Sequence, residues 1–216
     1  MVGRSGGEYP EQRKAMREEI ILLGAGGHCK SCIDVIEQSN AFEIRGIIDI
    51  KEHLGKNILG YQVIGSDEDL ERLVAVYKNY LIAIGQMRHP DTRIRLSELI
   101  RRLGGQCPVV ISPRAYVSKH ATIGKGTIVM HNAVVNAGAT IGEYCIINTG
   151  SIIEHDATIG NYCHISTNAT INGGAVVKER SFVGSKAVTK EYVTIGENSF
   201  VPANTLMKTS KEEVNS

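Results

Sequence analysis

The chain has almost no excess of charge of either sign. Lysine and arginine together number 24 against 23 aspartates and glutamates, which gives a formal net charge of +1. A chain so balanced gives no reason to expect nucleic acid or an anionic membrane surface as a partner. A small molecule is therefore the expected ligand.

Long apolar runs are lacking as well. No run approaches the roughly 20 residues that span a bilayer, and the first residues, MVGRSGGEYPEQRKAMREE, contain no apolar core of an export signal. We therefore expect no membrane insertion and a cytoplasmic location. Hydrophobic residues make up 42% of the 216, which suffices for one large domain or two small ones.

Cysteines are too few and too scattered for a disulfide framework. There are five, an odd number, so free thiols are expected. Cys29 and Cys32 form a C-x-x-C, a spacing that also occurs in redox and zinc sites. No second Cys or His pair at zinc spacing accompanies it, so we predict no metal and interpret both as small residues at the start of a helix.

The first half of the chain has the pattern of an α/β domain. Residues 1–17 are polar and are expected to form an extension of little consequence. Between residues 18 and 111, strands are predicted in EIILLGA, EIRGIIDI, NYLIAIG and CPVVI, and helices in CKSCIDVIEQS and RIRLSELIRRL. This alternation predicts a parallel sheet with helices, ending near Ser112-Pro113.

Residues 112–210 carry a repeat of six residues, followed by a short tail at 211–216. Stepping by six from Val117 to Met207 meets an aliphatic residue or methionine at fifteen of sixteen positions, Thr189 being the exception. A small residue lies two positions before each of these, except at Val193. This period predicts a parallel β-solenoid in which three hexapeptides complete a triangular coil. Residues 18 apart then stack at roughly the 4.7–4.9 Å spacing of neighbouring strands.

The hexapeptide array, preceded by a GAGGH turn after an opening strand, resembles the NeuD/PglD family of sugar acetyltransferases over roughly residues 18–210. The resemblance implies an N-terminal Rossmann-like parallel α/β domain that binds a nucleotide sugar, followed by a left-handed parallel β-helix. It also implies a homotrimer with active sites between subunits and acetyl-CoA as cosubstrate. The handedness comes from the resemblance, because the usual rule for crossovers favours the right hand.

The stretch Asn148–Gly174 resembles the active-site coils of the family. His155 matches the catalytic histidine, and neutral imidazole can remove a proton from an attacking amine or hydroxyl near pH 7. Asp156 matches the acidic residue that orients or polarises it. Glu154 points to the opposite side of an extended segment and ranks below Asp156. His131 occupies the same place in its hexapeptide, a coil and one face earlier, and is interpreted as structural.

Coenzyme and substrate residues follow from the same resemblance. His164 and Gly173 match family positions that contact the coenzyme or its acyl group. The later coils are expected to hold the pantetheine and adenine, with Gly184, Ser185 and Ala203 as further candidates. Gly173 is also the position at which a backbone N–H can approach the oxyanion. Pro202-Ala203-Asn204 matches the terminal G-x-P-A-K type sequence of the family only in part. The positions expected to bind the nucleotide sugar are Gly24, Gly26, Gly27, His28, Asp49, Gly85 and Arg93.

The glycine-rich turn also bears on which nucleotide binds. It follows a strand and opens a helix, an arrangement that holds phosphate. Cys29 replaces the third glycine of the dinucleotide fingerprint, and fewer than a hundred residues are available for a complete NAD fold. A nucleotide-sugar diphosphate is therefore the better fit.

These residues support one hypothesis and leave several alternatives open. The hypothesis is direct acetyl transfer from acetyl-CoA to the amino group of a UDP-linked amino sugar, with His155 as general base. The alternatives are O-acetylation of sialic acid or a related sugar, a non-catalytic β-helix that serves assembly, an NAD-dependent oxidoreductase and a zinc hydrolase. Cys163 as a nucleophile is disfavoured, because alanine occupies its repeat position elsewhere.

Overall fold

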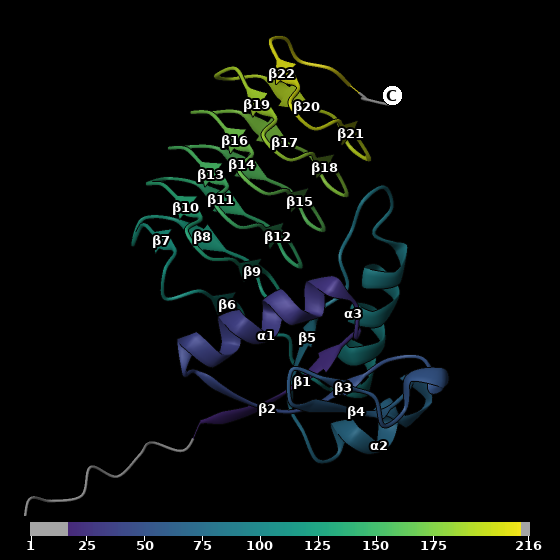
Figure 1. Cartoon of the computed structure of the whole chain (residues 1–216). Helices are drawn as coiled ribbons and strands as arrows, with labels where there is room; N and C mark the ends of the chain where they lie inside the picture. Colours follow the sequence, from purple (N-terminus) through teal and green to yellow (C-terminus); the bar gives the residue numbers. More distant parts are fainter. Residues whose placement is uncertain (1–16, 213–216) are drawn as a thin grey trace, which may run out of the picture.

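The computed structural model describes residues 17–212, which form a small α/β domain and a tall three-sided β-helix (Figure 1). The extension predicted at residues 1–17 lies outside the described residues except for Arg17. Of the tail predicted at 211–216 only Lys211 and Glu212 are described, and Lys211 pairs with Ile195 of the β-helix. No helix within residues 17–212 is long and apolar enough to cross a membrane.

The α/β domain is built on a five-stranded sheet of order β3-β4-β2-β1-β5. Its strands are β1 (Glu18–Leu23), β2 (Phe42–Ile48), β3 (Asn57–Ile58), β4 (Tyr61–Gly65) and β5 (Asn79–Ile82). All pairs are parallel except β3 with β4. The helices are α1 (Gly27–Ser39), α2 (Leu70–Val74) and α3 (Asp91–Leu103), with short 3-10 turns at η1 (Lys51–His53) and η2 (Asp67–Asp69). The parallel order 4-2-1-5 is that of one Rossmann half, as predicted.

The β-helix consists of two-residue strands, one in each hexapeptide. One face holds β7 (Tyr116–Val117), β10 (Val134–Val135), β13 (Ile152–Ile153), β16 (Thr170–Ile171), β19 (Val188–Thr189) and β22 (Leu206–Met207). The second face holds β8 (Thr122–Ile123), β11 (Thr140–Ile141), β14 (Thr158–Ile159), β17 (Val176–Val177) and β20 (Thr194–Ile195). The third holds β6 (Val110–Ile111), β9 (Ile128–Val129), β12 (Ile146–Ile147), β15 (His164–Ile165), β18 (Phe182–Val183) and β21 (Phe200–Val201).

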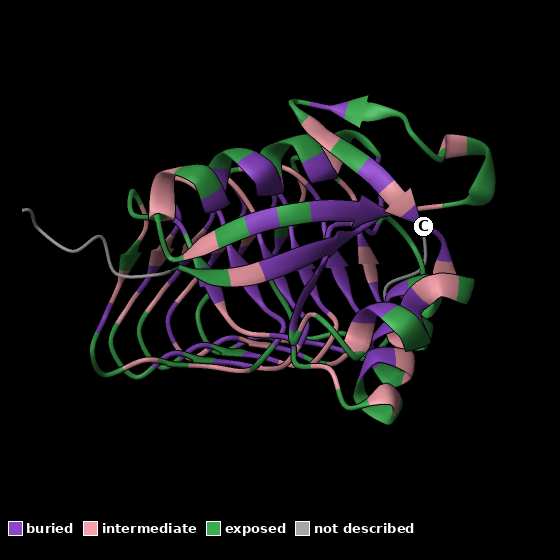
Figure 2. Ribbon diagram, turned by 90° about the horizontal axis from the view of Figure 1, so that it is seen from below, coloured by how far each residue is buried: buried purple, intermediate pink, exposed green. Residues whose placement is uncertain are grey.

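Coils stack with the predicted spacing of 18 residues. Val135 pairs with Ile153, and Ile147 pairs with Ile165. The second residue of most strands is buried in one core that runs through the prism. Figure 2 shows these inward residues as buried, with the exposed positions at the corners. Burying each such aliphatic side chain stabilises the fold by about 1.5–3 kcal/mol, so the repeat accounts for the three-sided parallel β-helix predicted from it.

One predicted strand belongs to the other domain. The sequence analysis assigns CPVVI to the end of the α/β domain, but β6 pairs in parallel with β9 and opens the third face of the β-helix. Its Val110 packs with α1 and with Ile128 and Ile146 in one core shared by both domains. The hydrogen-bonded β-helix therefore begins at Val110, two residues before the predicted boundary.

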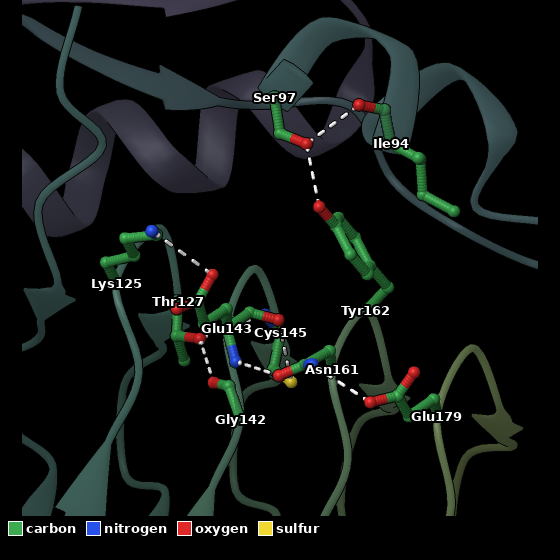
Figure 3. A network of polar contacts seen from close by, with 10 residues as sticks. All are labelled: Ile94, Ser97, Lys125, Thr127, Gly142, Glu143, Cys145, Asn161, Tyr162 and Glu179. Atoms are coloured by element: carbon green, nitrogen blue, oxygen red, sulfur yellow. Dashed lines mark hydrogen bonds and ion pairs between the residues drawn. The ribbon is translucent and has the colours of Figure 1, made fainter. Parts of the chain in front are cut away.

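A second joint links α3 to a corner of the β-helix, and Figure 3 shows its polar contacts. Tyr162 lies in that corner and stacks on Tyr144 of the coil below, with ring centroids 5.1 Å apart. The hydroxyls of Tyr162 and Ser97 are 2.9 Å apart, and Ser97 donates to the carbonyl of Ile94. The α/β domain therefore contacts the β-helix at two places: α3 hydrogen-bonds this corner, and α1 packs on the third face of the β-helix.

Candidate active site

An imidazole–carboxylate pair occupies the corner between β13 and β14. Nδ1 of His155 lies 2.9 Å from Oδ2 of Asp156, and the two side chains are 57% and 71% exposed. Asp156 has φ of 60°, a left-handed conformation that aspartate tolerates. The hydrogen bond that His155 donates to the carboxylate of Asp156 raises the pKa of His155. It also favours the tautomer that carries its proton on Nδ1, which leaves the lone pair of Nε2 available to accept a proton.

The carboxylate of Glu154, the residue before His155, bonds a side chain of another coil. Oε2 of Glu154 accepts a hydrogen bond of 2.9 Å from the side-chain amide of Asn136 in the coil below. Its contact with His155 is a long one of 3.4 Å to the backbone N–H. The carboxylate on the imidazole is therefore that of Asp156, in agreement with the ranking from sequence.

Gly173 lies in the next coil, directly against the His155 ring. A Cβ added to Gly173 would come within 2.7 Å of both Cε1 and Nε2 of His155. The following residue, Gly174, donates its N–H to the carbonyl of His155 over 3.0 Å. A glycine at position 173 thus leaves room for the imidazole. Its predicted backbone contact with the acyl group stays a prediction.

The glycine-rich turn opens a pocket of about 740 Å³ between the two domains. Asp49 fixes this turn, because its Oδ2 accepts the N–H of Ala25 over 2.6 Å and its Oδ1 accepts the N–H of Ile50. Gly26 caps α1, so the first N–H groups of the helix begin at the pocket wall. The pocket is lined by Gly24, Gly26, Gly27, His28, Asp49 and Gly85 together with Gln86, Asn148 and His164. All the predicted substrate residues except Arg93, and one predicted coenzyme residue, therefore meet here.

His164 is buried where the pocket meets the β-helix. Its Nδ1 donates to the carbonyl of Gln86 over 2.6 Å, and its Nε2 lies 3.0 Å from the side-chain nitrogen of Asn148. Burial lowers the pKa of His164 to about 4, so its ring is neutral near pH 7. Phe182 packs edge-on against it from the next coil. In this structure both ring nitrogens are used within the protein, and the predicted contact with the coenzyme stays a prediction.

Arg93 belongs to the first turn of α3 and lies outside the pocket wall, with 1% of its surface exposed. Its guanidinium donates to three backbone carbonyls, those of Ile82, Ile84 and, across the domain joint, Tyr144. Burial lowers its pKa to about 10, which still leaves it charged. In this structure Arg93 therefore holds the domain joint and the loop that follows β5, and the substrate contact expected from sequence stays a prediction.

The remaining coenzyme candidates stack along one edge of the prism. A Cβ on Gly184 would meet the backbone nitrogen of Ala203 at 2.5 Å, and the carbonyl of Ser185 accepts the N–H of Asn204. The hydroxyl of Ser185 lies 3.0 Å from that of Ser166. This edge is formed by the corners that come directly after the strands of the third face, and Asn148 lies on the same edge in a lower coil. His155 lies on the next edge, so a single chain does not bring the imidazole pair to the pocket.

Other candidate groups are engaged in structural contacts. His131 bridges the domains, with Nε2 2.8 Å from Asp34 on α1 and Nδ1 2.6 Å from the buried hydroxyl of Ser112. Cys163 is buried, its pKa is raised, and its Sγ donates to the carbonyl of Lys178. Burial also raises the pKa of Cys29, to about 12. Within residues 17–212 no cluster of His, Cys, Asp or Glu is arranged to hold a metal ion.

Two residues that line the pocket are not among the site residues predicted from sequence, Gln86 and Asn148. Gln86 follows the AIG strand end without belonging to any motif, and its place beside His164 depends on the packing of the two domains. Asn148 has the appearance of a corner asparagine of the repeat. Its contact with the ring of His164 is visible only once the coils are stacked.

Domain families match both halves of the chain. Residues 19–98 match the PglD N-terminal domain, and residues 106–215, about half of the chain, match the GMPPB C-terminal domain. No protein of curated function matches the chain in sequence.

Several solved structures superpose on nearly the whole chain. The acetyltransferase domain of PglB from Neisseria gonorrhoeae is 28% identical, with a TM-score of 0.82, over 90% of this chain and 93% of that one. PerB from Caulobacter crescentus, solved with CoA and GDP-perosamine, is 29% identical, with a TM-score of 0.83, over 92% and 91%. WeeI from Acinetobacter baumannii shares the fold at 24% identity and a TM-score of 0.76, over 89% and 92%. The chain belongs to the NeuD/PglD family of hexapeptide-repeat sugar acetyltransferases.

Proposed function

We propose that the protein transfers the acetyl group of acetyl-CoA to the amino group of a UDP-linked amino sugar. The relatives support the reaction class, since the PglB domain has also been solved with acetyl coenzyme A and PerB with CoA and GDP-perosamine. GDP-linked amino sugars are therefore tested beside UDP-linked ones.

The observation that carries the proposal is the His155–Asp156 pair. With Nδ1 held by Asp156, Nε2 of His155 removes a proton from the amine as its nitrogen attacks the thioester carbonyl. The tetrahedral intermediate then collapses, the C–S bond breaks, and the imidazolium returns the proton to the coenzyme thiolate. Asp156 stabilises the imidazolium in between. Transfer is direct, because the thiol of Cys163 is buried and its raised pKa keeps it protonated.

The interdomain pocket supplies the place for the nucleotide sugar. The N–H groups at the start of α1, in the turn that contains Gly26 and Gly27, favour a diphosphate. Asp49 and Gly85 line the same pocket toward the nucleoside. The pantetheine arm runs along the edge that carries His164, Ser185 and Ala203.

The active site is completed by a second copy of the chain in a homotrimer. Two facts support this proposal: His155 and the pocket lie on different edges of one prism, and the first face carries an outward apolar column. That column contains Tyr116, Val134, Ile152, Val188 and Leu206, with Tyr116 and Leu206 more than half exposed. Refolding H155A together with a pocket variant such as G27D should restore activity that neither variant has alone. Mixed oligomers without any restored activity would contradict a shared site.

A coenzyme-release assay across acceptor classes tests the proposed function. The panel contains UDP-amino sugars, GDP-amino sugars and sialic acids, and the product is identified by mass spectrometry. N-acetylation of an amino sugar nucleotide is the expected result. O-acetylation of sialic acid in its place would establish the alternative acceptor, and failure to bind coenzyme A by calorimetry would favour a non-catalytic assembly role.

A further inference from the structure

The side chain of Gln86 is the most buried unpaired polar group at the pocket wall. Gln86 lies in the loop between β5 and α3 and has 3% of its surface exposed. Neither Oε1 nor Nε2 of its carboxamide has a hydrogen-bond partner among residues 17–212. A carboxamide can accept and donate at once, and burying both functions unpaired opposes folding. Such a group at a pocket wall points to a ligand that pairs with it.

His28 contributes a second unpaired group to the same pocket. Its Nε2 is buried and has no partner among the described residues. Burial lowers the pKa of His28 to about 3, with smaller contributions from the charge of Arg93 and from His164, so the imidazole is neutral at physiological pH. Gly85, which precedes Gln86, packs against it, since a Cβ on Gly85 would lie 3.6 Å from Cβ of His28. The loop and the first turn of α1 thus present two neutral polar side chains to the pocket.

The loop that carries Gln86 is held at both ends. On one side, Arg93 donates to the carbonyl of Ile84. The carbonyl of Gln86 itself accepts the proton on Nδ1 of His164. On the other side, the guanidinium of Arg88 lies over the ring of Phe200, 5.3 Å from its centroid. The loop rises beside the third face in Figure 1, and these anchors fix the place from which Gln86 acts.

We propose that Gln86, together with His28, determines acceptor specificity by hydrogen-bonding a hydroxyl of the amino sugar. The inference rests on the proposed function and names the part of the substrate that this wall selects. A hydroxyl both donates and accepts, which matches a carboxamide beside a neutral imidazole. The diphosphate has its own partners in the N–H groups at the start of α1. Gln86 also adjoins His164, on the side of the pocket toward the coenzyme edge, where the sugar must reach.

The test compares acceptors that differ by one hydroxyl. UDP-linked and GDP-linked amino sugars and their monodeoxy analogues are assayed for kcat/KM with wild-type protein, Q86L, H28F and the control H89Q. His89 lies exposed on the same loop and outside the pocket wall. Wild type and H89Q should prefer one hydroxylated acceptor over its deoxy analogue by about 10- to 100-fold. Q86L should lose most of that preference while its rate with the deoxy analogue stays within about threefold of wild type.

Binding of the same nucleotide sugars is measured by calorimetry, so that the inference stands apart from acetyl transfer. Loss of hydroxyl discrimination in binding by Q86L supports it even if another acceptor is acetylated in the cell. A wild-type protein that acetylates no sugar in the panel would count against the proposed function. Equal losses by Q86L on every acceptor, or unchanged discrimination, would overturn the specificity role. Thermal unfolding serves as the folding control, and Q86L should be at least as stable as wild type, since it removes an unpaired amide.

Discussion

Gly173 and the imidazole of His155 are in contact across adjacent coils, and the ring leaves no space for a side chain at position 173. A Cβ at position 173 would lie 2.7 Å from Cε1 and Nε2 of the ring. Nε2 is the atom that accepts the proton in the proposed reaction. The position of the general base is therefore set by the residue one coil above it as well as by Asp156.

G173A should displace the imidazole without unfolding the protein. Gly173 does not have a left-handed backbone conformation, so alanine adds a steric contact but no backbone strain. We expect kcat to fall by about 10-fold or more, since small misplacement of a catalytic group is costly. The control E191A changes an exposed residue one coil higher and should keep wild-type activity. A G173A protein with full kcat would show that the contact does not constrain His155.

D156N should move the acidic limb of the pH–rate profile. Asp156 raises the pKa of His155, so the imidazole stays protonated, and inactive as a base, up to a higher pH than an ordinary histidine. Removing the carboxylate charge lowers that pKa and shifts the acidic limb of kcat to lower pH. The maximal rate falls at the same time, because the imidazolium loses its partner.

E154Q is the matched control for this pH experiment. Glu154 bonds the side chain of Asn136 and touches the backbone, not the ring, of His155. Its substitution should leave the acidic limb nearly in place. A profile for D156N that superposes on wild type would contradict the assigned role of Asp156.

T189V should destabilise the β-helix although it completes the aliphatic repeat. Thr189 is 1% exposed, and its Oγ1 accepts the backbone N–H of Asn172 over 2.9 Å. Valine removes that acceptor and leaves the partly buried N–H of Asn172 without it, at a cost of about 1–2 kcal/mol in the free energy of unfolding. Urea denaturation measures the change, with T189S retaining the hydroxyl as a comparison. A T189V protein more stable than wild type would show that the hydrogen bond contributes nothing.

The β-helix could be predicted from sequence because its determinants are local and repeated. Each hexapeptide supplies one inward aliphatic residue and one small residue, as at Ile153 and Ser151, and the same two residue types recur at the same positions of the next coil. The exception at Thr189 has a local explanation in its bond to Asn172. The contact between His155 and Asp156 could also be predicted from sequence, because the two residues are adjacent in one corner and their contact does not depend on distant parts of the chain.

Features that depend on tertiary packing or on unusual turn residues could not be predicted from the sequence. The hairpin of β3 and β4 was missed because Leu59 and Gly60 both have positive φ, and leucine stands where such a turn usually has asparagine. Arg93 has the spacing of an exposed helical charge, yet it is buried at the domain joint. Gln86 contacts His164, 78 positions further along the chain, only because the packing of the two domains brings the loop to the third face.

The most direct test of the central claim is single-turnover acetyl transfer by H155N. Asparagine keeps a polar side chain at the corner but cannot take up the proton. With acetyl-CoA and the best nucleotide-linked amino sugar of the panel, H155N should transfer acetyl about 100- to 10,000-fold more slowly than wild type. Calorimetry should show unchanged binding of both substrates. A wild-type single-turnover rate in H155N would contradict the account.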